Sequence, residues 1–490
     1  MKYILSIDQG TTSTRALLFN HDGELVFKSQ QEVTCLYPHD GWVEQNALDI
    51  FLSVVNVIND CLNKFNITYD DIDSMGITNQ RETTVIWDRE TGMPLYNAIV
   101  WQSRQTVDIC NEWKQYEDLV HKKTGLIINP YFSASKIRFI LDRIENGQQR
   151  AENGELCFGT IDTWLMYKLS NKKIFKTDYT NASRTMLFNI STLKYDNELL
   201  KLFNIPKKML PAVKPSSSYF GVASYLHKNL KIYGVAGDQQ AALFGQNCFD
   251  VGESKNTYGT GCFMLVNIGE KPVFLNNGLI TTIIATGNNT VQYALEGSVF
   301  IGGAAIQWLR DSLRMIKSAG DSEAYATRVK DSGGVYVVPA FVGLGAPYWD
   351  DECRGAIFGL NRGTTKEHFI QAVLNSIALQ TRDVIKTIEN ETHIKLNVLK
   401  VDGGATANDY LMQYQANILN AKIVLPGCLE TTSLGAAYLA GLASGYFKDL
   451  DDIKKIHKIS KEFEPRMSQE EIDEIDKKWK KAIEATRVFK

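Results

Sequence analysis

Two similar strand–turn–strand patterns, about half the chain apart, constrain the fold more than any other feature of this sequence. In the first, an apolar run ends in Asp8, a turn of Gly, Thr and Ser residues follows, and apolar residues return after Arg15. In the second, the turn at residues 258–261 (YGTG) stands between two short apolar runs. Two such units in one chain indicate an internal duplication, with its boundary near residues 246–255.

The segments between these turns alternate between helical and strand patterns. Apolar residues recur at three- and four-residue steps through residues 48–62, which predicts a helix, and residues 72–78 form an apolar run typical of a buried strand. A second helical pattern spans residues 366–388, and a strand pattern follows at 396–401. A capping-box sequence at residues 468–471 predicts where the last helix begins. Strands mixed with helices predict an α/β protein with a central sheet.

Composition narrows the class of protein. A length of 490 residues suggests two large domains, and 44 % hydrophobic with 22 % charged residues is ordinary for a globular protein. The 53 basic and 56 acidic residues give a net charge of −3, so no electrostatic argument favours nucleic acid or an anionic membrane as a partner. The cysteines and histidines are scattered, without the spacing of zinc ligands.

No segment has the character of a membrane or secretion signal. The charge at Asp8 interrupts the apolar core that a signal peptide needs, and no run reaches the roughly 18 apolar residues of a membrane helix. We therefore expect no membrane span and a location in the cytoplasm or an organelle matrix.

Three turns rich in Gly and Thr are candidates for binding phosphate. They lie at residues 8–15 (DQGTTSTR), 258–261 and 402–408 (DGGATAN), whereas the usual phosphate-binding loops are absent. Backbone N–H groups in such turns can point at one anion, although each turn taken alone is more often an ordinary turn without a ligand. Together they predict a nucleotide site in which two hairpins hold the phosphates and the third turn lies against the adenosine. Asp8 would then hold Mg²⁺ through water, and Arg15 would offset phosphate charge.

Three further features suggest a site for a small hydroxylated ligand. Asp238 follows an apolar strand, where its carboxylate can accept a proton from a hydroxyl, although an N-cap is the common role of Asp before a helix. Arg81 and Glu82 offer a donor beside an acceptor, although an exposed ion pair is the favoured explanation of these two residues when taken alone. Aromatic residues also lie near the polar runs, as pocket walls or simply as core: Trp101, Tyr131 and Phe263.

These features together resemble the FGGY family of sugar kinases, of the actin-like ATPase superfamily, and its members that act on glycerol in particular. The matching segments, in chain order, are residues 8–13 (DQGTTS), 79–83 (NQRET), 237–242 (GDQQAA), 258–263 (YGTGCF), 343–349 (GLGAPYW), 402–404 (DGG) and 434–437 (LGAA). The resemblance implies two ribonuclease-H-like (actin-like) domains with a central cleft. Residues 1–248 would carry the glycerol site and the phosphate hairpin, and residues 249–490 would bind ATP through its adenosine.

The resemblance also implies an activity and a role for individual residues. The reaction would be phosphorylation of glycerol by ATP to sn-glycerol 3-phosphate and ADP, with Mg²⁺, in a homodimer or homotetramer. Asp238 would be the general base, and Asp8 and Asp238 would approach Mg²⁺. The expected glycerol contacts are Arg81, Glu82, Trp101, Tyr131, Asp238, Gln239 and Phe263. The expected nucleotide contacts are Thr11, Thr12, Ser13, Arg15, Thr260, Gly303, Gln307, Gly404 and Asn408.

Two alternatives remain open at this stage. One is a kinase of the same family that acts on another polyol or a ketose, and the other is a non-catalytic actin-like ATPase.

The segment 216–233 lacks the GGTR stretch that accompanies inhibition by fructose 1,6-bisphosphate in some members of the family, so we do not expect that inhibition here. His227 lies near a region that is phosphorylated in some bacterial members, but its flanking residues differ.

Overall fold

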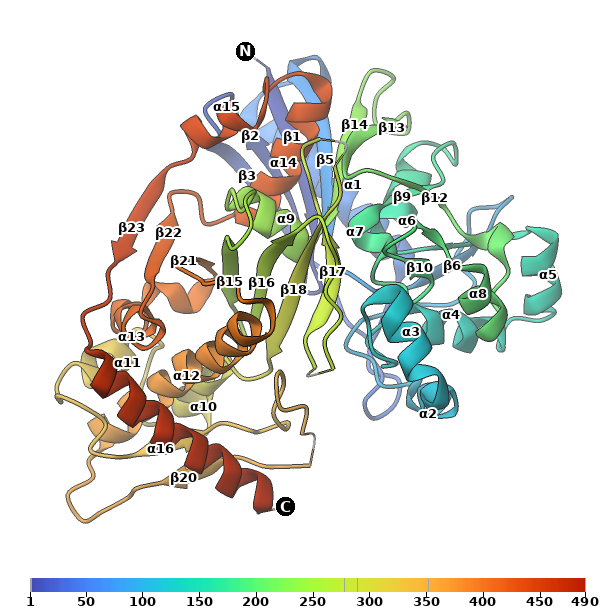
Figure 1. Cartoon of the computed structure of the whole chain (residues 1–490). Helices are drawn as coiled ribbons and strands as arrows, with labels where there is room; N and C mark the ends of the chain where they lie inside the picture. The colour runs from blue at the N-terminus through green and yellow to red at the C-terminus, as the bar shows by residue number, and fades with distance from the viewer. Residues whose placement is uncertain (1, 277, 289, 351, 490) are drawn as a thin grey trace.

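The computed structural model describes residues 2–276, 278–288, 290–350 and 352–489, and two large mixed sheets organise it (Figure 1). The first sheet has the strand order β3 (Leu25–Glu32), β2 (Ser13–Phe19), β1 (Tyr3–Gln9), β5 (Ile72–Asn79), β14 (Lys231–Gly237), β13 (Ser217–Val222). The second has the order β17 (Ile280–Ile284), β18 (Gln292–Val299), β16 (Cys262–Gly269), β15 (Ser254–Tyr258), β21 (Val398–Asp402), β22 (Lys422–Pro426), β23 (Ile459–Phe463).

The two sheets share one pairing pattern. In the first sheet, β3, β2 and β1 pair antiparallel, β5 and β14 add in parallel, and β13 is an antiparallel edge strand. The second sheet repeats this order with β18, β16 and β15, then β21 and β22, then β23. Strand β17 pairs with β18 and extends the second sheet at that edge. The repeated order confirms the internal duplication and the α/β class that the sequence predicts.

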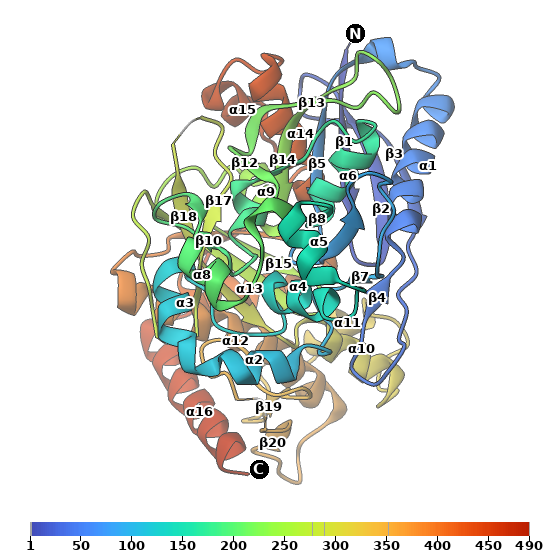
Figure 2. The same cartoon turned by 90° about the vertical axis from the view of Figure 1, so that its right-hand side faces the viewer.

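Helices and short strand pairs surround the sheets (Figure 2). The helices are α1 (Ala47–Phe65), α2 (Val107–Trp113), α3 (Glu117–Thr124), α4 (Ser133–Leu141), α5 (Gly147–Asn153), α6 (Ile161–Leu169), α7 (Tyr179–Ala182), α8 (Asn197–Leu202), α9 (Asp238–Gly245), α10 (Gly303–Asp311), α11 (Asp321–Ala326), α12 (Lys366–Thr392), α13 (Asp409–Leu419), α14 (Thr431–Ser444), α15 (Leu450–Ile456) and α16 (Gln469–Val488). The short pairs are β4 (Glu44–Gln45) with β7 (Ala98–Ile99), β6 (Val85–Asp88) with β8 (Leu156–Gly159), β9 (Lys176–Asp178) with β12 (Ala212–Lys214), β10 (Phe188–Asn189) with β11 (Lys194–Tyr195) and β19 (Tyr336–Val338) with β20 (Ala356–Phe358).

Within the described ranges, no helix combines the length and the apolar composition needed to cross a membrane.

Strand β1 shows how the first sheet is buried on both faces. Leu5 and Ile7 pack into the cluster that includes α1 and α6, whereas Ile4 packs into the cluster that includes α14. The Ser6 hydroxyl donates to the Ser433 carbonyl at 2.7 Å, and Asp8 accepts from the hydroxyl of the same serine at 3.3 Å. Because side chains alternate along a strand, Ile4, Ser6 and Asp8 all reach the α14 face.

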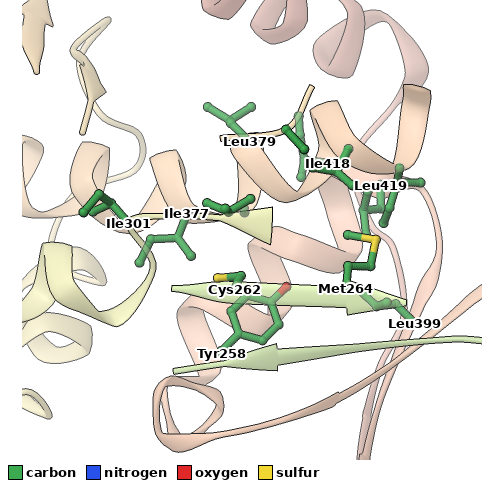
Figure 3. Packing of buried hydrophobic residues seen from close by; sticks show 14 of the residues in the cluster. Tyr258, Cys262, Met264, Ile301, Ile377, Leu379, Leu399, Ile418 and Leu419 are labelled. Carbon is green, nitrogen blue, oxygen red and sulfur yellow. The ribbon is translucent and has the colours of Figure 1, made fainter. Parts of the chain in front are cut away.

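The core of the second domain lies between its sheet and two helices. Met264 on β16 and Leu399 on β21 pack against Ile377 of α12 and Leu419 of α13, and all four are buried (Figure 3). The C-terminal helix α16 joins this core through Trp479, whose indole N–H donates to Asp383 of α12 at 2.7 Å.

The predicted elements agree with the structure, with small shifts at their ends. The helix predicted at 48–62 is α1, the strand at 72–78 is β5, and Ser468 caps α16 with the predicted capping box. The helix predicted to end at residue 388 continues to Thr392. Its last turn is polar and therefore invisible to apolar periodicity, and it stops where His393 takes a left-handed conformation (φ 58°).

Two helices connect the domains and cross each other between them. Helix α9 follows β14 of the first sheet and leads to β15 of the second, whereas α14 follows β22 of the second sheet and packs on the first. Glycines permit the close approach: a Cβ at Gly435 would lie 1.8 Å from the Ala241 carbonyl oxygen, and one at Gly245 would lie 2.0 Å from that of Thr431. Two of the passages of the chain between the domains meet at this crossing, and a third runs from α14 through α15 to β23 of the second sheet.

We expect Gly435→Ala to lower the free energy of unfolding by about 1–3 kcal/mol, because the added methyl group forces the two backbones apart. Thermal or urea denaturation measures this loss. Gly320→Ala is the matched control, since its Cβ would meet no atom closer than 4.0 Å, and it should change stability by less than about 0.5 kcal/mol. Equal melting temperatures for the two variants would contradict the tight crossing.

Candidate active site

A buried cluster of charged side chains joins the two domains. Arg81 follows β5, and its guanidinium donates two parallel hydrogen bonds of 2.8 Å to Glu296 on β18 of the second sheet. Arg184 donates to the same carboxylate at 3.1 and 3.3 Å and to Glu82 at 2.5 Å. Arg81 also donates to Gln240 at 3.1 Å. Arg81, Glu82, Arg184 and Glu296 are each at most 2 % exposed, so this charge quartet is removed from water.

Electrostatics treat the two glutamates of the quartet differently. Burial by itself raises the pKa of Glu296, but Arg184 and Arg81 outweigh it and lower the pKa to about 2. Burial raises the pKa of Glu82 more than its two arginine neighbours lower it. Glu82 also has a left-handed backbone (φ 61°), an uncommon conformation for this residue type. Two arginines and two glutamates balance in charge, which is what a buried cluster requires.

Asp238 lies beside this quartet, at the beginning of α9. Its carboxylate is 3.2 Å from Nε of Arg81, and its side chain is 31 % exposed. The preceding Gly237 takes the N-cap position, so Asp238 does not cap the helix. Burial raises the pKa of Asp238, and the Arg81 guanidinium opposes this effect. The carboxylate accepts a hydrogen bond from the Gln239 backbone N–H at 2.7 Å.

The aromatic residues expected around a ligand lie together. The Trp101 ring meets the Tyr131 ring edge-on with centroids 5.5 Å apart, and meets the Phe263 ring edge-on at 6.5 Å. The Trp101 indole N–H donates to the Thr11 hydroxyl at 2.9 Å. Phe263 lies on β16 of the second sheet, so this aromatic group contains side chains from both domains. The Trp101–Thr11 hydrogen bond connects it to the first Gly/Thr turn. The Arg184 guanidinium lies 5.7 Å from the Tyr131 ring centre.

The first turn is linked to the start of α14. Arg15 lies 3.6 Å from Asp8 and 3.3 Å from Glu430, which directly precedes that helix. Burial raises the pKa of Asp8 to about 6, although Arg15 lowers it. Thr12 is exposed and Ser13 is buried, and with Arg15 they line a cavity of about 420 Å³ beside β3.

The second and third turns touch each other. Gly403 has φ 95°, and a Cβ there would lie 2.5 Å from the Tyr258 carbonyl oxygen. Gly303 begins α10 and donates its N–H to the Gly259 carbonyl at 2.8 Å. Thr260, Gln307 and Gly404, all predicted to contact nucleotide, are exposed.

Asn408 is the least available of the predicted nucleotide contacts. It is buried, caps α13 by accepting from the Leu411 N–H at 2.9 Å, and donates to Ser322 at 3.1 Å. Its amide oxygen and one of the two N–H groups of its amide nitrogen are therefore already used within the protein.

Magnesium is compatible with the side chains at the junction of the domains. Across the described ranges, no group of three or more His, Cys, Asp or Glu side chains is arranged to hold a metal ion. Asp8 and Asp238 lie close enough for one carboxylate to influence the other. Mg²⁺ is commonly held by one or two carboxylates together with substrate phosphates, so this pair has suitable chemistry.

Comparisons with known proteins identify the family. The N-terminal domain model of the FGGY family of carbohydrate kinases matches residues 3–245, and the C-terminal domain model matches residues 254–444. A glycerol kinase of Bacillus mycoides is 57 % identical over 494 aligned positions that cover all of both chains. The chain belongs to the FGGY family of carbohydrate kinases.

Solved structures agree with this assignment. A Plasmodium falciparum glycerol kinase with ADP superposes with a TM-score of 0.94 at 37 % identity, over 99 % of this chain and 98 % of that one. A xylulose kinase of Lactobacillus acidophilus, at 24 % identity, has a TM-score of 0.88 over 99 % and 98 % of the two chains, which shows the common fold. The expected two-domain, actin-like architecture is thereby confirmed.

Sequence reasoning missed several polar residues at this FGGY site. Arg184 and Glu296 complete the charge quartet, and Lys255 on β15 donates to the Gln239 side chain. None of them lies in a segment that carried the resemblance. One signal was present: Glu296 is the single charged residue of β18, and Lys255 is the single charged residue of β15, which leads into a Gly/Thr turn.

We expect Glu296→Gln to lower the free energy of unfolding of this FGGY chain by about 3–5 kcal/mol, because two buried guanidiniums lose their shared counter-charge. Chemical denaturation measures the loss. Glu464→Gln serves as the control: its carboxylate pairs with Lys422 at 3.0 Å but is 63 % exposed, so the change should stay below about 1 kcal/mol. A Glu296 variant as stable as the control would show that the quartet does not join the domains.

Proposed function

We propose that this protein transfers the γ-phosphoryl group of ATP to glycerol, forming sn-glycerol 3-phosphate and ADP. The observation that carries the proposal is the 57 % identity, over both full chains, to a relative named glycerol kinase. The likeness to a glycerol kinase solved with ADP supports the use of ATP.

The charge balance of the site supports a small neutral substrate. Both guanidiniums of the quartet already have carboxylate partners, so neither offers an unpaired charge to an acidic sugar. Arg81, Glu82, Tyr131, Asp238 and Gln239 would provide hydrogen bonds to the hydroxyls of glycerol. Trp101 and Phe263 would cover its carbon skeleton.

Asp238 would act as the general base. Its half-buried carboxylate, 3.2 Å from Arg81, would accept the proton of the attacking hydroxyl as the phosphoryl group is transferred in line. Arg81 holds this carboxylate in place through the Nε contact, so the base and the substrate-binding residues share one rigid cluster.

The nucleotide would lie across the three Gly/Thr turns. Thr11, Thr12, Ser13 and Arg15 would contact the phosphates, and Thr260, Gly303, Gln307, Gly404 and Asn408 would contact the rest of ATP. Asp8 and Asp238 would hold Mg²⁺, which when bound neutralises charge on the phosphates.

The chain would then divide in two, with residues 1–248 carrying the glycerol site and residues 249–490 the adenosine site. Closure about the α9–α14 crossing would exclude water, a competing nucleophile. Assembly as a homodimer or homotetramer is a prediction that light scattering can test.

We expect the purified protein to release ADP in a coupled assay when ATP, Mg²⁺ and glycerol are supplied. In Asp238→Asn, kcat should fall by about 10²–10⁴ because the base is lost, while calorimetry still detects glycerol binding. Near-normal turnover in this variant would remove Asp238 from the role of base.

A panel of polyols and ketoses in the same assay tests the substrate. A preference for a larger polyol or a ketose would redirect the proposal within the family. ATP hydrolysis that is unaffected by every alcohol would favour an ATPase without a sugar substrate.

A further inference from the structure

Lys255 is a buried cation whose contacts lie directly beside the proposed glycerol site. It belongs to β15, the strand that leads into the turn at residues 258–261, and its side chain is fully buried. Its ammonium donates to the Gln239 side-chain oxygen and, at 2.9 Å, to the Thr257 hydroxyl. The carboxylates of Asp402 and Asp238 lie near enough to interact with its charge. A buried lysine is costly unless such partners compensate it.

The chemistry of this contact determines how the Gln239 amide is turned. An ammonium group has three donors and no acceptor, whereas an amide has an accepting oxygen and a donating nitrogen. The oxygen of Gln239 must therefore face Lys255. Among the residues that the structure describes, none accepts a hydrogen bond from Nε2 of Gln239, and this side chain is only half-buried.

We propose that Lys255 is a positioning residue for substrate: it fixes the Gln239 amide so that the −NH₂ group, rather than the oxygen, faces the substrate. Asp238 then offers an acceptor, and the adjacent Gln239 offers a donor, to neighbouring hydroxyls of a polyol. One hydroxyl would then donate to Asp238 while its neighbour accepts from Gln239. The inference rests on the proposed function for its substrate. It adds a role for Lys255, which is not among the expected glycerol contacts, and an orientation for Gln239, which is.

The first test compares Lys255→Met with the wild type. Methionine keeps the length and fills the buried space but cannot orient the amide. We expect KM for glycerol to rise about 10- to 100-fold, the range for a hydrogen bond that depends on a charged group, with KM for ATP unchanged. An unchanged KM for glycerol overturns the proposal, as does a loss confined to kcat or to KM for ATP.

A double-mutant cycle with Gln239→Met shows whether Lys255 acts through the amide. If it does, adding Lys255→Met to Gln239→Met should raise KM for glycerol no further. Additive effects would overturn the positioning role. Gln239→Glu is informative even where Lys255→Met fails to fold, because a glutamate still accepts from Lys255 but has no donor. It should weaken glycerol as much as Gln239→Met does, and wild-type affinity in this variant would overturn the proposal.

Lys400→Met is the matched control. Lys400 is the register partner of Lys255 on β21, but it donates to the Asn247 carbonyl and to Glu253 instead. It should leave KM for glycerol unchanged even if the melting temperature falls. Calorimetric titration of each variant with glycerol, or with the alcohol that the wild type prefers, separates this inference from the proposed function. If the wild type does not bind glycerol, only the proposed substrate is overturned. If wild type and Lys255→Met bind the preferred alcohol equally well, the inference is overturned.

Discussion

The carboxylate of Glu296, shared between Arg81 and Arg184, is the contact on which the geometry of the domain junction depends. It belongs to the second sheet, whereas both guanidiniums belong to the first domain, 215 and 112 residues away in the chain. Each arginine destabilises the charge of the other, so two buried cations at this point require an anion from across the domain boundary. With four of its N–H groups directed at Glu296, Gln240 and Asp238, Arg81 is immobilised. The position of Asp238 follows from that immobilised guanidinium.

Helix α9 links the site to the crossing with α14. It bears Asp238 and Gln239 on its first turn and crosses α14 at its last residue, Gly245. Because Glu296 ties the second sheet to Arg81 and Arg184, any shift of the domains about this crossing has to break or rearrange the quartet. Asp402, the last residue of β21 in the second sheet, contacts both helices near their crossing. It accepts hydrogen bonds from Gln246, which follows α9, at 3.0 Å and from Thr431, the first residue of α14, at 2.6 Å.

Local sequence patterns were informative wherever one element or one turn carried the signal. The strands and turn around Asp8, the helix that became α1 and the capping box at Ser468 each occupy fewer than about twenty consecutive residues. Periodicity and turn chemistry act over such distances. Arg81, Asp238 and the three aromatic residues were proposed from neighbouring residues or from the family resemblance. Their distances of 3.2, 5.5 and 6.5 Å then came from the structure.

Residues adjacent along the chain are enough to establish the two similar halves, their strands and turns, and the chemical types of the residues at the junction of the domains. Three features arise only once the chain has folded: Glu296 pairs with Arg81 and Arg184, Lys255 faces Gln239, and α14 returns to the first sheet. Glu296 lies 215 and 112 positions from its two arginine partners, whereas Lys255 and Gln239 are only 16 positions apart but belong to a strand and a helix that local patterns do not bring together. These contacts exist only once the chain has folded, and burial then makes each unpaired charge too costly to leave.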